Sequence, residues 1–418
     1  MAGPRDLVRR PTRAGFRKTH PPFKADRMNQ TETGHAAGPA AVTIPNRPYK
    51  AKLAPVAAGT WVRRDRLTES CYLVARGHRP VSGLRGYGTA TAERSAQAGV
   101  RTFLDQMAQT TLPVPDRYLL RLESVLGYPA RGLIGAPGRG ILTPSTNFTA
   151  LRPGPEPLTW PEPEKEPEPC FWLALPEHGN AYHWLINAMP ALMVARDRFG
   201  RDWSPTVILS GPLSRFQRSA LHFCRLKEPR YRPCPAGSYR FRQLVYPSPL
   251  GRPLPEPDPA LLRYREQVLR ILNRKDPRRP VTGRRLYISR QDARRRPLVN
   301  EASVIARLEA RGFETVRLSE LSFKKQVRAF AHADWIIGPH GAGLSHLLFA
   351  RPGCRVLELF TDRYLSPCMG RIAQWVGLDY RFAIFTQPPG PDRPQRAWQA
   401  DLAQLETWVD HWLSGDPL

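Results

Sequence analysis

The feature that most constrains the fold of this chain is a regular alternation of strand-like and helix-like segments in its last third. The segments typical of strands are short apolar runs, at residues 285–289, 314–317, 335–337, 355–360 and 380–385. The segments between them have helical periodicity, at residues 301–311, 322–333, 344–350 and 367–376. Strands that alternate with helices form a parallel sheet wrapped by helices. We therefore expect one doubly wound α/β domain at residues 256–390.

A second domain is predicted at residues 61–255. Its clearest strands are expected at 171–175, 206–210 and 243–246, and its helices at 181–199 and 214–226. Residues 61–150 show less pattern, with a candidate strand at 69–74 and a candidate helix at 101–109. A Pro- and Glu-rich spacer at 153–169 falls inside this domain, and a helix at 259–273 would lead to the next one. The predicted fold class is α/β, with two doubly wound domains.

The two ends of the chain differ from the rest. Residues 1–60 are rich in Pro, Arg, Gly and Ala and lack periodicity, which predicts a disordered basic tail. Residues 391–418 are assigned to an amphipathic C-terminal helix, because Leu402, Leu405 and Val409 recur at helical spacing.

The net charge limits the partners and the compartment. The chain has 63 Lys and Arg residues against 36 Asp and Glu, a formal charge of +27, which favours anionic partners. An arginine-rich proteome would produce the same excess, and both explanations stay open. The longest apolar stretch, 181–195, is shorter than the ~20 residues that cross a bilayer, and no apolar segment follows the N-terminal arginines. We expect a cytoplasmic protein with peripheral contact at the inner face of an anionic membrane.

The six cysteines include no Cys-x-x-Cys pair and no histidine at zinc-binding spacing. We expect reduced thiols and no metal site.

One strand of the C-terminal domain runs directly into a glycine-rich turn. The turn consists of His340, Gly341, Ala342 and Gly343, between the strand at 335–337 and the helix at 344–350. Backbone N–H groups at such a helix start bind phosphate, and glycine allows a phosphate to approach the backbone closely. His340 would donate a further hydrogen bond to a departing diphosphate. The alternative is a tight turn in which the glycines serve only packing.

Other polar residues are expected at the same edge of the sheet. Arg290 follows the strand at 285–289 and offers paired donors to a phosphate. Arg295, Asn300 and Glu301 come next and are further candidates on the donor side, unless the run is a solvated basic loop. Glu358, near the end of the strand at 355–360, would accept hydrogen bonds from ribose hydroxyls or form a salt bridge.

These residues, in this order and spacing, resemble glycosyltransferase family 61. The positions that carry the resemblance are Tyr287 to Arg290, Arg295, Asn300, Glu301, Gly312, Phe313, Gln326, His340 to Leu344, Phe349, Pro352, Gly353 and Glu358. A second piece at 179–190, with His183 and Trp184, is similar to the aromatic helix of the family's N-terminal domain. His346 departs from the family pattern, which often has Asn there.

The resemblance implies a GT-B architecture, in which two Rossmann-like domains face a cleft and the second holds the donor. It also implies an inverting, metal-independent transfer of a hexosyl or pentosyl group from a nucleoside diphosphate sugar, UDP-linked by default, with no cofactor. The family includes capsular-polysaccharide enzymes, so the expected acceptor is a glycan or lipid-linked glycan in capsular or extracellular polysaccharide synthesis.

Inverting transfer needs a general base for the acceptor hydroxyl. His183 is the candidate, because it lies near the start of the N-domain helix and imidazole titrates in the useful range. Glu177 and His178, in the same turn, are substitutes. A local hydrogen bond at the helix start is the alternative role for His183.

Two other functions stay open beside the enzyme. One is a nucleotide-sugar-binding protein without catalysis. The other is a basic nucleic-acid-binding protein, but the sequence has no RNP motif, helix-turn-helix signal or zinc spacing, so we expect no nucleic acid partner.

Overall fold

The computed structural model describes most of the chain from residue 98 onward and shorter pieces before it. The described residues are 42–44, 48–49, 61–62, 68–80, 84–87, 98–136, 140–142, 158–160, 164–165, 170–248, 258–275, 283–387 and 396–414. The predicted tail (1–60) and the predicted spacer (153–169) lie largely outside these ranges. The described strand β1 (Val42–Ile44) of the tail pairs antiparallel with the described strand β9 (Leu158–Trp160) of the spacer.

The C-terminal part of the chain forms a parallel sheet with the strand order β16-β15-β17-β18-β19-β5. Its strands are β15 (Arg285–Ile288), β16 (Phe313–Val316), β17 (Trp335–Pro339), β18 (Arg355–Thr361), β19 (Asp379–Phe385) and β5 (Arg85–Tyr87). The helices between them are α7 (Glu301–Glu309), α8 (Phe323–Ala331), the 3₁₀ helix η5 (Ala342–Phe349) and α9 (Cys368–Val376). The predicted alternation of strands and helices in this third of the chain is confirmed.

The strand order contains a reversal that matters for the site. From β15 the chain moves outward to β16 and then returns past β15 to β17, which lies on its other side. The loops after β15 and β17 therefore leave the sheet in opposite directions and open a crevice at the carboxyl ends of these strands. Open α/β sheets bind their ligands at such a reversal.

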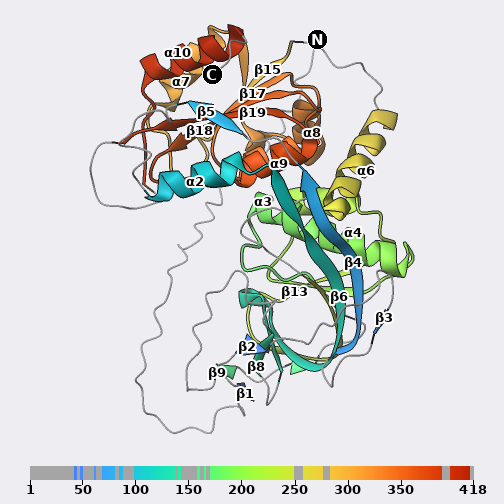
Figure 1. Cartoon of the computed structure of the whole chain (residues 1–418). Coiled ribbons are helices and arrows are strands. Elements are labelled where there is room, and N and C mark those ends of the chain that lie inside the picture. Colours follow the sequence, from blue (N-terminus) through green and yellow to red (C-terminus); the bar gives the residue numbers. More distant parts are fainter. Residues whose placement is uncertain are drawn as a thin grey trace, which may run out of the picture. The chain divides into compact units, whose positions relative to one another are not determined.

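A segment predicted to belong to the N-terminal domain joins this sheet instead. Strand β5 pairs parallel with β19, and helix α2 (Ala98–Ala108) packs beside α9 (Figure 1). The ring of Phe103 lies 5.2 Å from that of Phe360 and 5.1 Å from that of Phe382. Burial of this apolar face against the sheet favours the arrangement, and local sequence does not show which sheet a short strand will join. The domain limits themselves stay a prediction.

The second sheet is larger and mixed. Four of its strands are parallel neighbours in the order β13-β12-β11-β14, at Arg230–Pro233, Thr206–Leu209, Cys170–Trp172 and Tyr239–Ser248. Strand β14 then pairs antiparallel with the long strand β6 (Thr111–Tyr128), which also pairs antiparallel with β4 (Thr68–Pro80) and β7 (Leu133–Ala136). The coarse prediction of a mixed α/β protein with two parallel-rich sheets is confirmed. The antiparallel half was not foreseen, because residues 61–150 showed little periodicity.

The predicted helix at 181–199 forms, but it is interrupted. Helix α3 (Ala181–His183) passes into a π-helical turn at Trp184–Ala188 and then into α4 (Met189–Phe199). The Met189 N–H donates to the Trp184 carbonyl, five residues back. Pro190 follows in α4 and has no N–H to donate to a preceding carbonyl, which favours this wide turn. Such turns recur at functional sites.

Two helices contact the segments that connect the strands of the C-terminal sheet. Helix α6 (Pro259–Lys275) follows the mixed sheet, and its Arg265 donates to the carbonyls of Leu348 (2.7 Å) and Ala350 (2.8 Å) at the end of η5. Helix α10 (Leu402–Ser414) lies within the predicted C-terminal segment 391–418 but is shorter than it, and Arg311 of the α7–β16 turn binds Asp410 of α10. Trp412 of α10 packs edge-on against Trp335, 4.7 Å between ring centroids.

Three expectations can be compared with the described residues. Five of the cysteines, Cys170, Cys224, Cys234, Cys354 and Cys368, are buried. No group of three His, Cys, Asp or Glu residues in the described ranges is placed to hold a metal ion. Among the described helices, none has both the length and the apolar character needed to cross a membrane.

The Phe103→Ala variant tests the packing of α2 on the C-terminal sheet. Phe103 is fully buried against two aromatic rings, so its removal leaves a cavity and should lower the free energy of unfolding by about 3–5 kcal/mol. Urea denaturation measures the loss. Asp105→Ala on the exposed face of the same helix is the control and should change stability by less than about 0.5 kcal/mol. Equal stability of the two variants would contradict this packing.

Candidate active site

The predicted glycine loop lies at the carboxyl end of β17, in the crevice where the strand order reverses. After it the chain forms the 3₁₀ helix η5, where an α-helix was expected. Local hydrogen bonds stabilise the tighter turn: Ser345 Oγ donates to the Ala342 carbonyl (2.7 Å), and the Leu344 N–H donates to the Gly341 carbonyl (2.9 Å). The backbone at Gly341 is extended, with φ of 173°, so this position does not require glycine for conformational reasons.

Space is the reason for glycine at position 341. The guanidinium of Arg290, which follows β15, lies directly against this residue. A Cβ atom at Gly341 would stand 1.4 Å from Arg290 Nη1. The structure thus brings the predicted arginine and the predicted glycine loop together, and the missing side chain makes room for the arginine.

Arg290 is held by two hydrogen bonds, one from its side chain and one from its backbone. Its Nη2 donates to the Arg295 carbonyl (2.9 Å), and its backbone N–H donates to Glu301 Oε1 (2.7 Å). Its Nε is buried and has no acceptor among the described residues. Burial, and secondarily the nearby Arg296, lower the pKa of Arg290. A desolvated cation with an unused donor is a favourable partner for an anion.

Glu301 and Asn300 make hydrogen bonds that order neighbouring segments of the protein. The Glu301 carboxylate is buried and accepts from Tyr287 Oη (3.0 Å) as well as from the Arg290 N–H, so it orders the loop that carries Arg290. The Asn300 side chain donates to the Ala400 carbonyl (2.7 Å) and accepts from the Ala400 N–H (3.1 Å). Asn300 therefore fastens the segment before α10, and the donor contact predicted for these two residues is not what their side chains make in this structure.

His340 is nearly buried and rigidly held. Its Nδ1 lies 2.6 Å from Glu358 Oε1, and its ring stacks on Phe360 with 5.0 Å between centroids. The other oxygen of Glu358 accepts from the Tyr380 hydroxyl. The sequence suggested that Glu358 accepts hydrogen bonds from ribose hydroxyls. In the structure its carboxylate is completely buried and both its oxygens are engaged, so it is not positioned to meet them. It orients His340 instead.

His183 lies across from Arg290. It lines a cavity of about 380 Å³, which we call the His183 cavity, together with Glu177, Asn180, Arg290, Ala342 and others. Burial lowers the pKa of His183 to about 4, so the ring is neutral at pH 7. Its Nδ1 is 3.0 Å from the Asn187 amide nitrogen. His178 is not among the residues that line the cavity; its Nε2 lies 3.2 Å from the Pro212 carbonyl.

Two residues of this region were missed by the sequence analysis. Tyr364 lines the His183 cavity, and its ring lies 5.5 Å from that of His340. The guanidinium carbon of Arg296 stands 3.9 Å above the Tyr364 ring, a cation–π contact. The sequence analysis singled out the neighbouring Arg295, and only the fold shows that Arg296 faces an aromatic ring.

The His183 cavity is the first of three adjoining cavities. The second, of about 210 Å³, lies over the glycine loop and shares Arg290, Ala293 and Ala342 with the first. We call it the loop cavity. The third, of about 820 Å³, shares Leu318 and Gly343 with the loop cavity and includes Phe216, Phe323 and His346. We call it the aromatic cavity. The three form a continuous row along the crevice.

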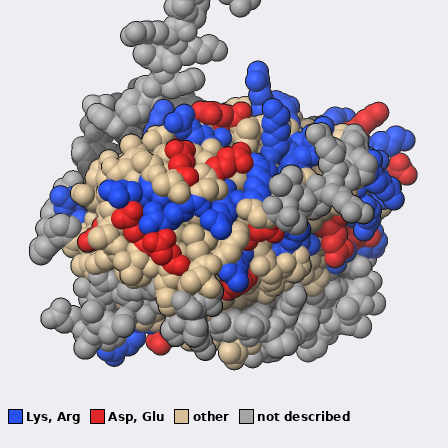
Figure 2. All heavy atoms as spheres, turned by 90° about the horizontal axis from the view of Figure 1, so that it is seen from above, with Lys and Arg blue, Asp and Glu red and all other residues tan. Residues whose placement is uncertain are grey.

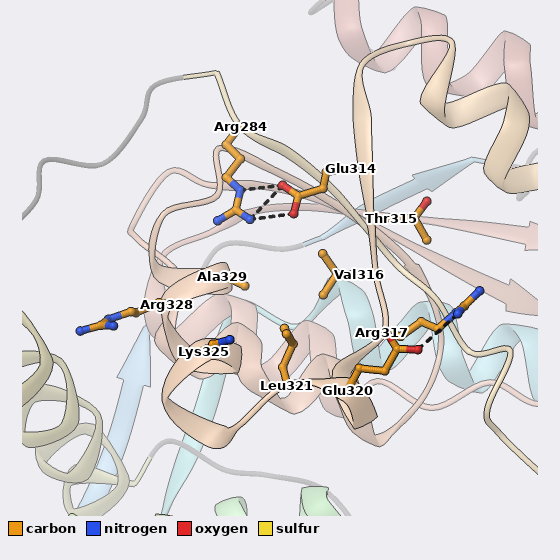
Figure 3. Close-up of a pocket in the computed structure, with 10 residues that line it drawn as sticks. All are labelled: Arg284, Glu314, Thr315, Val316, Arg317, Glu320, Leu321, Lys325, Arg328 and Ala329. Carbon is orange, nitrogen blue, oxygen red and sulfur yellow. Dashed lines mark hydrogen bonds and ion pairs between the residues drawn. The ribbon is translucent and has the colours of Figure 1, made fainter. Parts of the chain in front are cut away.

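A fourth hollow lies between the edge strand β16 and α8 and shares Glu320 and Leu321 with the aromatic cavity (Figure 3). It measures about 310 Å³ and is bordered by two ion pairs, Arg284–Glu314 and Arg317–Glu320. Its lining also includes Lys325 and Arg328, and none of the predicted site residues.

Comparison with known proteins agrees with the arrangement of this site. Residues 181–357 match the family model described as "Glycosyltransferase 61", a span that includes His183, Arg290 and the whole glycine loop. This part of the chain thus resembles the domain of a glycosyltransferase, of the glycosyltransferase 61 family.

Curated relatives are similar over short segments. The chain is 43% identical over 63 residues to "Beta-1,2-xylosyltransferase" of Arabidopsis thaliana, which covers 15% of this chain and 12% of the relative. It is 35% identical over 98 residues to "EGF domain-specific O-linked N-acetylglucosamine transferase" of Drosophila melanogaster, which covers 23% of this chain and 18% of the relative. The matches span less than a fifth of the length of these relatives.

Two histidines of the crevice, the buried His346 and the half-buried His183, predict a loss of stability in acid. Burial lowers the pKa of both His183 and His346 to about 4, whereas an unfolded histidine titrates near ~6.5. The unfolded chain therefore binds more protons between pH 6.5 and 4, and the free energy of unfolding should fall across this window by up to ~1.4 kcal/mol per pH unit for each histidine.

Urea denaturation at several pH values measures this dependence. Wild type should lose stability as the pH falls from 6.5 to 4, and His346→Leu should show a shallower loss over the same window. The same slope in wild type and variant would mean that His346 is not buried as a neutral ring.

Proposed function

We propose that this protein is a glycosyltransferase that moves a sugar from a nucleoside diphosphate donor to a hydroxyl of a glycan acceptor. The observation that carries the proposal is the desolvated guanidinium of Arg290, packed against Gly341 within a domain of the glycosyltransferase 61 family. The named activities of the relatives support sugar transfer as the reaction and a hexosyl or pentosyl group as its cargo.

In this proposal the diphosphate of the donor binds in the loop cavity. Arg290 provides the positive charge, and the proposal places the backbone N–H groups of Gly341, Ala342 and Gly343, which line the same cavity, against the anion. His340, oriented by Glu358, would donate from Nε2 when the ring carries a second proton. Fixed charges of this kind stabilise a leaving diphosphate, so we propose a metal-independent reaction.

His183 is the proposed general base, and the transfer is a single displacement with inversion. The acceptor hydroxyl oxygen attacks the anomeric carbon, its proton passes to His183, and the bond from that carbon to the diphosphate oxygen breaks with its electron pair. Base action requires a free lone pair on the nitrogen that faces the cavity. This holds if the Asn187 amide presents its oxygen to Nδ1–H, which keeps Nε2 unprotonated. Glu177 lines the same cavity and is the substitute.

The geometry also supports a second candidate, a nucleotide-sugar-binding protein without catalysis. As the Asn187 amide stands, its nitrogen faces His183 Nδ1 and donates to it. The ring proton then resides on Nε2, where it would block base action. Release of diphosphate by the wild type separates the two candidates.

Finer features are part of the proposal as well. We propose a GT-B arrangement, a UDP-linked donor, a lipid-linked or polysaccharide acceptor in capsular or extracellular polysaccharide synthesis, and a cytoplasmic site of action at the inner membrane face. Basic side chains favour an anionic surface, and Figure 2 shows them interspersed with acidic ones on the face that it draws. No base-reading motif accompanies the net charge in the sequence, so we propose no nucleic acid partner.

Replacement of Gly341 by alanine tests the site. The added methyl group would occupy the place of the Arg290 guanidinium, so Arg290 must swing away, while the extended backbone accepts alanine without strain. We expect the affinity for the nucleotide sugar that wild type prefers to fall at least about tenfold, about 1.4 kcal/mol, with the thermal midpoint little changed. Isothermal titration with UDP-xylose and UDP-N-acetylglucosamine, in the presence of EDTA, measures it.

The matched control is Gly99→Ala on α2, where an added Cβ meets no atom within 4 Å. This variant should bind as wild type does. Equal affinity of Gly341→Ala and wild type would contradict the role of Arg290, and loss of binding on addition of EDTA would contradict a metal-independent reaction. Absence of binding to any nucleotide sugar would overturn the proposed function.

A further inference from the structure

The His183 cavity is lined by arginines that do not line the proposed diphosphate site. They are Arg290 and the run Arg294 to Arg296, whereas Glu177 is the one acidic residue among the described residues of this lining. The loop cavity, where the diphosphate is proposed to bind, shares Arg290 with the His183 cavity but is lined by none of the other three. The run 294–296 is therefore available for a second anionic group, beside His183.

Two of these arginines have no partner in the described part of the chain. The guanidinium groups of Arg294 and Arg295 form neither an ion pair nor a hydrogen bond with a described residue, and both side chains are exposed. The nearest carboxylate in sequence, that of Asp292, lines the loop cavity and not this one. Neighbouring like charges repel each other, so an anion bound among them would stabilise the loop.

The third arginine of the run is held in place. Arg296 has a φ of 54°, a left-handed conformation that residues other than glycine seldom adopt. Its guanidinium carbon lies 3.9 Å from the centre of the Tyr364 ring, and this contact helps to offset the backbone strain. The contact joins the loop after β15, which carries Arg296, to the loop after β18, which carries Tyr364. The arginine run thus forms a fixed wall of the cavity.

The size of the cavity indicates which substrate meets this wall. A volume of about 380 Å³ is near the lower end of the range of ligand sites, so it encloses only the end of an acceptor glycan. The rest of the glycan leaves through the mouth. Arg294, Arg295 and Glu177 are the exposed residues of the described lining and mark that mouth. The transferred sugar is bonded to the diphosphate and lies nearer to the glycine loop.

We infer that the acceptor is an acidic glycan, in which uronic acid residues next to the reacting hydroxyl bind Arg294 and Arg295 through their carboxylates. This inference rests on the proposed function and names the class of its acceptor. A carboxylate matches the parallel N–H donors of a guanidinium in a paired hydrogen bond. A neutral sugar has no charge to offer and would leave the repulsion within the run unchanged.

The test compares acidic oligosaccharides with their methyl esters, which lack the charge but keep the sugar rings. The full-length protein is first saturated with UDP, or with GDP if only GDP binds, so that the loop cavity is occupied. It is then titrated calorimetrically with tetragalacturonate, a hyaluronan tetrasaccharide and a heparosan tetrasaccharide. We expect at least one of these to bind, and its methyl ester to bind at least about tenfold more weakly, about 1.4 kcal/mol.

Variants of the two unpaired arginines locate the effect. Arg294→Gln and Arg295→Gln should each weaken binding of that oligosaccharide at least about threefold, in keeping with exposed charges. The affinity for its methyl ester should stay as in wild type. The matched control is Arg270→Gln, which makes the same change of charge at an exposed position of α6, outside the four cavities. It should bind every probe as wild type does.

Several outcomes would overturn the acidic acceptor while leaving the transferase intact. They are equal binding of an acid and its methyl ester, no binding of any acid to the nucleotide-saturated protein, and an equal loss in Arg270→Gln and Arg294→Gln. UDP-glucuronate that binds more tightly than UDP-xylose, with the difference lost in Arg294→Gln, would assign the arginines to the transferred sugar instead.

Two further results separate the sources of the charge and the function itself. If geranyl diphosphate binds the nucleotide-saturated protein through Arg294 and the acidic oligosaccharides do not, the arginines bind the diphosphate of a lipid-linked acceptor and the inference is wrong. If neither UDP, GDP nor any nucleotide sugar binds, the proposed function fails, whatever the oligosaccharides do.

Discussion

The packing of a desolvated arginine against a glycine is the interaction on which the site depends. The Arg290 guanidinium occupies the volume that a side chain at position 341 would take, and it joins the loop after β15 to the loop after β17. These are the two strands at which the order of the sheet reverses. The positive charge of Arg290 therefore lies at the crevice. Glu301 accepts a hydrogen bond from the Arg290 N–H and so keeps the loop after β15 in place.

Buried polar groups support this arrangement from behind. Glu358 lies inside the sheet with its two oxygens engaged by His340 and Tyr380, so the histidine ring is held before any ligand arrives. An unpaired buried carboxylate would be costly, and the two donors offset that cost. Preorganised donors contribute most to a reaction in which charge develops on a leaving group, because they need not reorient as the bond breaks.

Comparison of the sequence predictions with the structure shows where local pattern is informative. The strands and helices from 285 to 385 were predicted nearly residue by residue, because each buried strand is a short apolar run and each helix has its own periodicity. The region from 61 to 150 was not, since its long strand β6 pairs with distant partners on both sides. Strand β5 is too short to carry a pattern, and it joined the C-terminal sheet through contacts that appear only after folding.

The sequence alone determined the strands of the C-terminal parallel sheet from β15 to β19, the glycine loop after β17, and the arginine that follows β15. Strand, turn and helix are local features, and the residues that form them are neighbours in the chain. Only the tertiary structure decided the roles of Glu358 and Gly341. The role of Glu358 depends on its burial, and that of Gly341 on the volume of the Arg290 side chain, about fifty residues away in sequence. The row of three cavities likewise depends on which loops the strand order brings together, and that order is a property of the whole fold.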